Sequence, residues 1–366
     1  MTKNLVKQAD REDQLQFLRF LAFLNVFITH AERWLFFEYP SSHCGISAVS
    51  FFFMLSGVVT GYSFFGKNVT LGFKEELSFL WKRLRKIYPL YLITTLFTVL
   101  ISGIPVKIIS GDYAGAVPDL TQLLKNLLLL QSWFPENAHS FNSVGWYLST
   151  LMFLYAFSIP FAFLLDRIFK TVKPYLITAL LFAAIFLSVV VYCYLTQGDA
   201  MTYLHFEFPP ARLGEYLMGM IIGFTAHSIK NRFHSGSGIQ ILFTVLEISA
   251  LIYWFVSLDH PGNYWRNHTV SWLIPNAFVL SVFILGQGWC SRLFRWKPLV
   301  SLGNVSFECY LVHQIIVTRY YSNIWGYSPT QAGNIFSFFF CLLFSLMIAY
   351  FIHSAKSVPR TMEKVQ

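Results

Sequence analysis

Long apolar stretches alternate with short polar ones along the whole chain. Ten of the apolar stretches are long enough to cross a bilayer. Pro89 lies at the start of the third, so that boundary is the least defined. The pattern predicts a single all-α domain over residues 1–366, a polytopic membrane bundle with spans near 15–37, 46–65, 87–103, 145–165, 174–195, 211–228, 239–258, 269–288, 299–321 and 331–353.

The cations between these stretches predict how the bundle is oriented. Alternate threading from an inside N-terminus leaves only Lys107, Lys125 and Arg266 in outside segments. Because cytoplasmic loops are enriched in Lys and Arg, the distribution favours an N-in, C-in topology and an even number of spans. The inside segments are then 1–14, 66–86, 166–173, 229–238, 289–298 and 354–366, of which the first and last are cytoplasmic tails.

Composition agrees with a membrane protein and narrows the possible partners. The chain is 55% hydrophobic and only 12% charged, about half the charge of a soluble globule. Its net charge of +9 follows from the inside cations, so we expect a bilayer and no nucleic acid as partner. The five cysteines lack CxxC spacing, and no metal site is expected. The leucine-rich part of the external stretch 104–144 predicts a short interfacial helix or a re-entrant segment.

The first apolar stretch holds two groups capable of chemistry. Arg19 and His30 are eleven residues apart, which places both on one helix face, roughly 16 Å apart along the axis. A cation in a membrane helix needs a partner anion, water or protein, and a neutral imidazole is the usual proton-transfer group. The pair therefore predicts an anion-binding group and a base. The alternative is that Arg19 snorkels to the interface and His30 caps the helix.

Five segments in order resemble motifs of the acyltransferase 3 family of membrane acyltransferases. Arg19 and His30 match its first-helix signature, Ser56-Gly57 its second-helix pattern, and His313 ends its late Tyr-Leu-x-His signature. The resemblance implies that Arg19 and His30 are catalytic. The segments are LRFLAFLNVFITH (18–30), SFFFMLSGVVTGY (50–62), WKRLRKIYPLYL (81–92), FPPARLGEYLMGMIIG (208–223) and LGNVSFECYLVHQ (302–314).

Two positions depart from that family's pattern. Lys86 stands where the family usually has an arginine three residues before the proline, so the charge is kept but the bidentate fork is lost. After Trp146, Leu151 and Met152 occupy the positions where many members carry a pair of acids. No base can be assigned to that pair in this chain.

The basic loop 82–86 and the second span are the expected acyl-donor site. Lys82, Arg83 and Lys86 would clamp the phosphates of coenzyme A, or else only anchor the topology. Ser56 and Gly57 would leave a slot for the pantetheine arm, or else only allow close helix packing. For Ser56 and Gly57, a slot for the pantetheine arm and close helix packing are compatible functions.

The acceptor site is expected at the outer ends of later spans. Arg212 and Glu215 would bind acceptor hydroxyls, or else pair with each other on one helix face. Trp146 would stack on a sugar ring, or else anchor the helix in the interface. His313 is grouped with these acceptor-side residues. Its alternatives are to orient His30 or the acyl donor, or to bond a neighbouring helix.

An unpaired Arg19 would be costly, so we expect an acidic partner, with Glu308 and Glu247 as the candidates. His30 would act as general base on the acceptor hydroxyl or first accept the acyl group as an acyl-imidazole. Arg19 would bind donor phosphate or stabilise charge on the thioester oxygen. The sequence leaves each of these choices open.

Together these features predict a multi-pass O-acyltransferase of a bacterial plasma (inner) membrane. It would move an acyl group, most simply acetyl, from cytoplasmic acyl-CoA to a carbohydrate hydroxyl, with acetyl-CoA as substrate and no permanently bound cofactor. The acceptor is a surface polysaccharide, peptidoglycan or a lipid-linked sugar, and the oligomeric state is open. The competing classes are a transporter of an anion or glycan lipid, with Arg19 and His30 as substrate and proton sites, and a structural or sensory membrane component. No broken helix pair of the transporter type stands out in the sequence.

Overall fold

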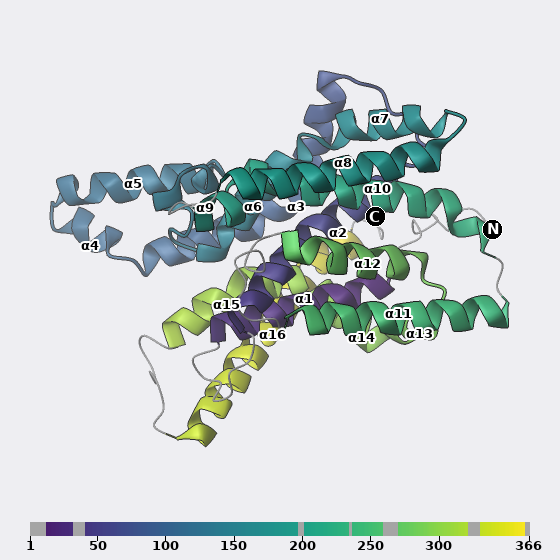
Figure 1. Ribbon diagram of the computed structural model, residues 1–366. Helices are drawn as coiled ribbons and strands as arrows, with labels where there is room; N and C mark the ends of the chain where they lie inside the picture. The colour runs from purple at the N-terminus through teal and green to yellow at the C-terminus, as the bar shows by residue number, and fades with distance from the viewer. Residues whose placement is uncertain are drawn as a thin grey trace.

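The computed structural model describes residues 12–31, 41–196, 201–233, 236–258, 270–320 and 330–362. Within these ranges the chain consists of helices and turns, as the all-α prediction requires (Figure 1). Most of the predicted N-terminal tail, and Arg266, lie outside them. Two antiparallel helices, α1 (Gln14–Ala31) and α2 (Ser41–Phe64), occupy the middle of the bundle.

Among the described residues, the most extensive contact between two helices joins α2 to α10 (Leu213–Ile229), and it depends on glycine. A Cβ atom on Gly57 would lie 2.0 Å from the carbonyl oxygen of Tyr216, and one on Gly219 would lie 2.0 Å from that of Met54. Gly61 and Gly223 continue the same contact. Because helices associate in membranes through close backbone packing, these glycines fix the two helices against each other.

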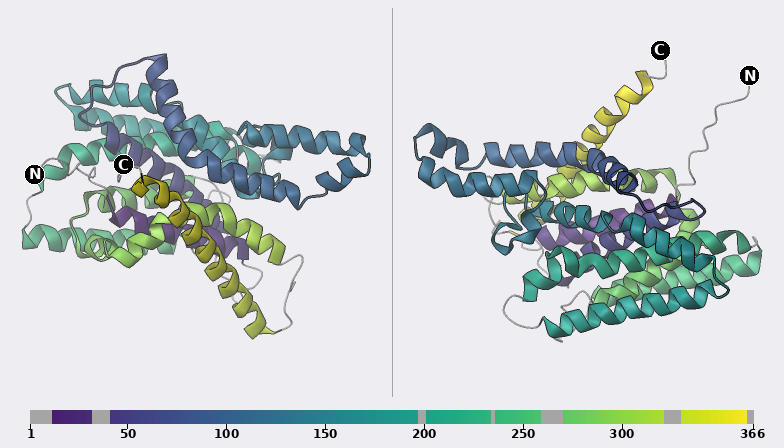
Figure 2. Two further views of the ribbon diagram at one scale, coloured as in Figure 1. Left: turned by 180° about the vertical axis from the view of Figure 1, so that it is seen from behind. Right: turned by 90° about the horizontal axis from the view of Figure 1, so that it is seen from above.

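The remaining helices surround this centre (Figures 1 and 2). Those on the outside of the bundle expose rows of large apolar side chains, as expected of surfaces that face lipid. Helices α12 to α15 pack against α1, α7 and α8 against α10, α11 against α12, and α16 against α15. Their bounds are α7 Ser158–Phe169, α8 Pro174–Leu195, α11 Ser237–Leu258, α12 Val270–Leu285, α13 Trp289–Phe294, α14 Lys297–Asn304, α15 Ser306–Tyr320 and α16 Gln331–Met362.

Four of the described helices are long and apolar enough to cross a membrane, and six if two bent helix pairs each count as one span. The four are Cys44–Phe64, Pro174–Leu195, Ser237–Leu258 and Ala332–Lys356. The predicted tail from 354 onward continues α16 as far as Met362. The chain is thus a multi-helix membrane protein, and the count of ten spans with both ends inside stays a prediction.

The bent pairs correct two spans that were predicted to be straight. The span 145–165 is bent by 46° between α6 (Trp146–Tyr155) and α7, and 299–321 is bent by 56° between α14 and α15. Pro160, in the first turn of α7, has no N–H to bond back to the preceding turn, which favours a bend at this point. The second bend follows Gly303, where α14 touches the backbone of α1 at Gln16.

The basic segment 82–86 was predicted to be a loop, and this is wrong. It lies inside α3 (Phe73–Leu100), which runs without a break through Pro89. Glu75 and Glu76 fall in the first turn, where negative charge favours the helix dipole. Lys and Arg are good helix formers, so a run of cations need not end a helix.

The first part of the stretch predicted to be external forms an arm of two helices, α4 (Ile104–Ile109) and α5 (Tyr113–Leu127), that projects from one end of the bundle (Figure 1). Helix α5 agrees with the helix predicted from the leucine spacing, and it exposes Leu120 and Leu124. Leu129 has a positive φ of 55°, which turns the chain away from the helix. Three short helical segments come after the arm: η2 (Gln131–Trp133), η3 (Pro135–Asn137) and η4 (Ser143–Gly145). Two more lie between α8 and α10: α9 (Met201–Phe206) and η5 (Pro209–Arg212).

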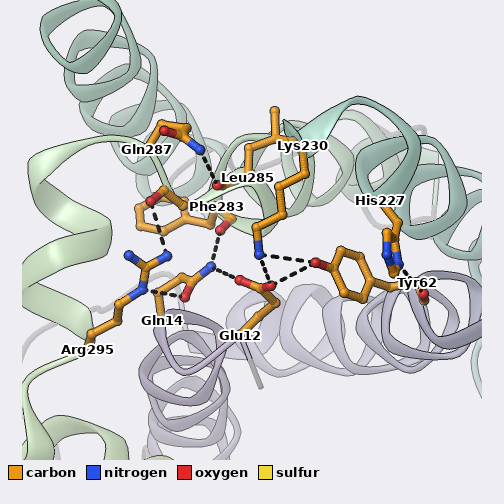
Figure 3. A network of polar contacts seen from close by, with 10 residues as sticks. Glu12, Gln14, Tyr62, His227, Lys230, Phe283, Leu285, Gln287 and Arg295 are labelled. Carbon is orange, nitrogen blue, oxygen red and sulfur yellow. Dashed lines mark hydrogen bonds and ion pairs between the residues drawn. The ribbon is translucent and has the colours of Figure 1, made fainter. Parts of the chain in front are cut away.

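A polar network holds the end of the bundle where α1 begins (Figure 3). Glu12 accepts hydrogen bonds from Gln14 at 2.8 Å and from Tyr62 at 2.9 Å, and it pairs with Lys230. Arg295 donates to Gln14 at 3.0 Å. The network joins α1 to α2, α10 and α13, so it fixes the start of α1 and leaves His30 at the opposite end of the molecule.

Candidate active site

Two histidines from distant parts of the chain meet inside the bundle. Nδ1 of His30, near the end of α1, lies 2.8 Å from Nε2 of His313 in α15. Their rings are nearly parallel, with an interplanar angle of 13°. His313 is fully buried and His30 is half-buried. His313 was placed with the acceptor-side residues, and the structure shows that it contacts His30 directly.

The surroundings of His313 fix its orientation. Its Nδ1 lies 2.8 Å from the carbonyl oxygen of Tyr310 and 3.2 Å from that of Cys309, one turn earlier in α15. Phe23 of α1 meets the ring edge-on, with centroids 5.4 Å apart. Phe27 lies 6.1 Å away by the same measure. Packed aromatic rings and two backbone carbonyls leave this imidazole little freedom to turn.

An aromatic cluster, made of Phe52, Tyr147 and Tyr310, connects the histidines to the middle of the bundle. The ring of Tyr310 lies 5.9 Å from that of His313 and 5.4 Å from that of Tyr147. Phe52 of α2 lies 6.2 Å from Tyr147 and 6.1 Å from Tyr310. The Tyr147 phenol in turn interacts with Ser56 and with the charge of Arg19. The cluster therefore lies between the histidine pair and these two groups.

Arg19 is half-buried and its guanidinium donates to Gln16 at 3.0 Å. The two acids proposed as its partners bind other groups. Glu308 pairs with Lys356 at 3.0 Å. Glu247 accepts hydrogen bonds from the backbone and side chain of Ser291, where it caps the start of α13. These acids therefore stabilise the fold through contacts other than those the sequence suggested.

The three cations assigned to the acyl donor have different orientations on α3. Lys82 and Lys86 are exposed. Arg83 points inward: its guanidinium lies 5.0 Å from the ring centroids of both Phe79 and Tyr155. It also lies 3.4 Å from the hydroxyl of Thr60, a weak hydrogen bond. Arg83 is thus the cation that reaches from the surface of α3 into the bundle.

Ser56 and Gly57 occupy different positions on α2. Ser56 is half-buried, bonds the carbonyl of Phe52 in its own helix at 2.8 Å and meets the Tyr147 phenol. Gly57 faces the backbone of α10 at Tyr216. The contacts give Gly57 the packing function and leave Ser56 beside the aromatic cluster.

The other residues expected to bind the acceptor are buried. Arg212 and Glu215 are fully buried and bond each other at 2.7 Å, which matches the alternative of an intrahelical ion pair. Arg212 also donates to the carbonyl of Phe206 at 2.9 Å. Trp146 is only 3% exposed and packs on Phe53 and Phe206. In this structure these side chains support one another and do not form an open surface.

The sequence reasoning missed a pair at the same end of the molecule as His30. His139 and Glu207 form an ion pair with an Nε2–Oε1 distance of 2.8 Å. The hydrogen bond to Glu207 raises the pKa of His139, while partial burial opposes the shift. His139 is close enough to His30 for its charge to act on that ring. The partners are 68 residues apart in the chain, and no motif connects them.

The fold and site define a class: a helical membrane protein with a paired-histidine polar site inside its bundle. A family model described as an acyltransferase domain matches residues 12–354, so the chain belongs to the acyltransferase 3 family, as its motifs predicted. It is also similar to acyltransferase MdmB of Streptomyces mycarofaciens, with 28% identity over 339 residues, or 84% of this chain and 79% of that protein. No solved structure matches it.

Proposed function

We propose that this membrane acyltransferase carries an acyl group, most simply acetyl, from a cytoplasmic coenzyme A thioester to a hydroxyl of an extracytoplasmic or lipid-linked carbohydrate. The bilayer would be a bacterial inner membrane. The observation that carries the proposal is the His30–His313 hydrogen bond, in a chain that matches an acyltransferase domain over nearly its whole length. A half-buried imidazole with a fixed partner is suited to proton transfer.

The acyl donor would enter at the end of the bundle where α1 begins. Lys82 and Lys86 are exposed for the nucleotide phosphates, and Arg83 reaches inward to Thr60. From Thr60 the second helix leads to Ser56 one turn away, because the Thr60 hydroxyl bonds the Ser56 carbonyl at 2.8 Å. The aromatic cluster then leads to the histidines. A long, thin pantetheine arm fits such a route between helices.

In the reaction, His30 accepts the proton of the acceptor hydroxyl as its oxygen attacks the thioester carbonyl. The carbon–sulfur bond breaks, and the coenzyme A thiolate recovers the proton from the His30 imidazolium and leaves as a thiol. Arg19 would stabilise the negative charge on the thioester oxygen. If His30 first takes the acyl group as an acyl-imidazole, the carbon–sulfur bond breaks in that step and the thiolate takes up the proton that the acylated ring releases. The acceptor oxygen then attacks the acyl group, and the proton of its hydroxyl restores the neutral His30.

The competing function is transport of an anion or a glycan lipid. The two bent helix pairs remove one argument against it, since broken helices line substrate sites in many transporters. Family membership favours acyl transfer. A transporter moves its substrate intact, whereas a transferase consumes acyl-CoA.

Thiol release separates the two functions. Purified protein in detergent would be given acetyl-CoA with and without candidate carbohydrate acceptors, and free coenzyme A thiol would be measured. We expect release that depends on both the protein and the acceptor, with an ester formed on the sugar in equal amount. The absence of any release with every acceptor class, from protein shown to be folded, would favour the transporter.

A further inference from the structure

The hydrogen bonds around His313 have only one consistent direction. A carbonyl oxygen can only accept, so Nδ1 of His313, facing the carbonyls of Tyr310 and Cys309, must carry a proton. In a neutral imidazole the other nitrogen is then an acceptor. Nε2 of His313 therefore accepts from Nδ1–H of His30, at 2.8 Å. It follows that Nε2 of His30 keeps its lone pair.

We propose that His313 is a positioning residue that holds His30 in the tautomer whose Nε2 is free to react. The inference rests on the proposed function, because a preferred tautomer matters only if His30 transfers protons or acyl groups. Without His313, either nitrogen of His30 could carry the proton, and the ring could turn. In the serine protease triad a carboxylate has the corresponding position, and loss of the correct tautomer there costs several orders of magnitude in rate.

The group that accepts the hydrogen bond from His30 is the neutral ring of His313, and this has a chemical consequence. When Nε2 of His30 takes a proton, the positive charge is shared through Nδ1–H with the lone pair of His313, with no full negative charge beside it. The imidazolium is then a strong acid, well suited to return its proton to the leaving thiolate. If Nε2 is acylated, Nδ1 can release its proton to His313, which gives a neutral acyl-imidazole and a protonated His313.

The geometry supports a dedicated function for His313 over simple packing. Its ring is fully buried yet uses both nitrogens, one toward its own helix and one toward His30. Phe23 and Phe27, one turn apart on α1, pack against it from the helix that carries His30. One helix thus supplies both the reactive histidine and the walls that orient its partner.

Substitutions of His313 test this function when the rate and the binding are separated. In His313→Leu the hydrogen-bond acceptor for Nδ1–H of His30 is lost. We expect kcat to fall by about 100-fold while the KM for acetyl-CoA stays within about threefold. In His313→Gln an amide oxygen can still accept from Nδ1–H, so most of the lost rate should return. Ser345→Ala, which removes a fully buried hydroxyl that bonds within its own helix, is the control and should act like the parent.

Nitrogen-15 spectra of histidine-labelled protein give a readout that packing alone would not change, and the parent protein and His313→Leu would be compared. We expect His30 to be protonated at Nδ1 and unprotonated at Nε2 in the parent, and to show mixed tautomers in His313→Leu. The inference is overturned if the parent carries the proton on Nε2 of His30, or if folded His313→Leu has the parent kcat. His30→Ala separates the two proposals: if it is inactive while His313→Leu is normal, the proposed function stands and only the positioning function fails.

Discussion

The ion pair of Arg212 and Glu215 shows how burial changes the function of a charged side chain. Both groups are fully buried, and Arg212 lies between the rings of Phe53 and Phe206. Two charges removed from water are stable only while they compensate each other. The pair therefore ties the start of α10 to the segment before it.

If this pair supports the fold, Arg212→Leu should destabilise the protein strongly, by about 3–5 kcal/mol, because it leaves the Glu215 carboxylate buried without compensation. The double variant Arg212→Leu/Glu215→Leu should recover most of that loss. Thermal unfolding in detergent measures both. An acceptor-binding function predicts the opposite result: unchanged unfolding temperatures and a raised KM for the sugar in each variant.

The ion pair of His139 with Glu207 makes the stability of the protein depend on pH. Its pKa is raised by the hydrogen bond to Glu207, so its contribution to stability is fully present below the ordinary histidine value and is lost as the pH rises through the folded-state pKa. The side chain is 53% exposed, which keeps the effect small. We expect the unfolding temperature of His139→Gln to lie below that of the parent at about pH 5, and the gap to close by about pH 8. A gap that is the same at every pH would contradict the ion pair.

Residue chemistry was only partly predictable from the sequence. His30 and Arg19 could be chosen as candidates because a polar group in an apolar stretch is conspicuous. The His30–His313 contact could not, since the two residues are 283 positions apart and only the packing of α1 against α15 brings them together. For the cations of α3, the sequence could not tell which side chain points inward. Arg83 and Lys82 are adjacent in sequence, yet Arg83 points inward and Lys82 is exposed.

At the scale of helices, the contact of α2 with α10 is the feature that positions the site. It fixes Ser56 and Phe52 of α2 beside α6, and Arg212 at the start of α10. Both helices present glycines to each other at distances that a methyl group could not occupy. Gly57 in the Ser-Gly pair of α2 is therefore explained by packing before any contact with a substrate.

Gly57→Ala should push α2 away from α10, because its Cβ would lie 2.0 Å from the Tyr216 carbonyl oxygen. We expect a loss of about 1–3 kcal/mol and a lower unfolding temperature. Gly103→Ala is the matched control: a Cβ there meets nothing within 4 Å, and the φ of −71° suits alanine. Equal unfolding temperatures for the two variants would show that the contact tolerates separation.

Helix positions could be predicted from hydropathy, but helix directions could not. Apolar segments located most helices because burial in lipid requires apolar side chains over a certain length. Hydropathy does not report bends, so the breaks after Tyr155 and Asn304 were missed. It also placed the cations of α3 in a loop, since charge was taken to end a helix, whereas these residues continue it across Pro89.

At the scale of the whole molecule, the two groups of candidate residues lie at opposite ends of the central helices. The cations of α3 and the network around Glu12 are at the end where α1 begins, and His30 with the His139–Glu207 pair is at the other. Arg19 and the aromatic cluster lie between them. This arrangement suits an enzyme whose two substrates approach from different sides of a membrane.

Transfer across a bilayer tests this account most directly. Protein would be reconstituted into vesicles with acetyl-CoA, labelled in the acetyl group, on one side and a carbohydrate acceptor on the other. We predict that the acceptor gains the label without any acetyl-CoA crossing, and that folded His30→Ala transfers none. The account is contradicted if intact acetyl-CoA crosses the bilayer, or if His30→Ala transfers the label at the rate of the parent.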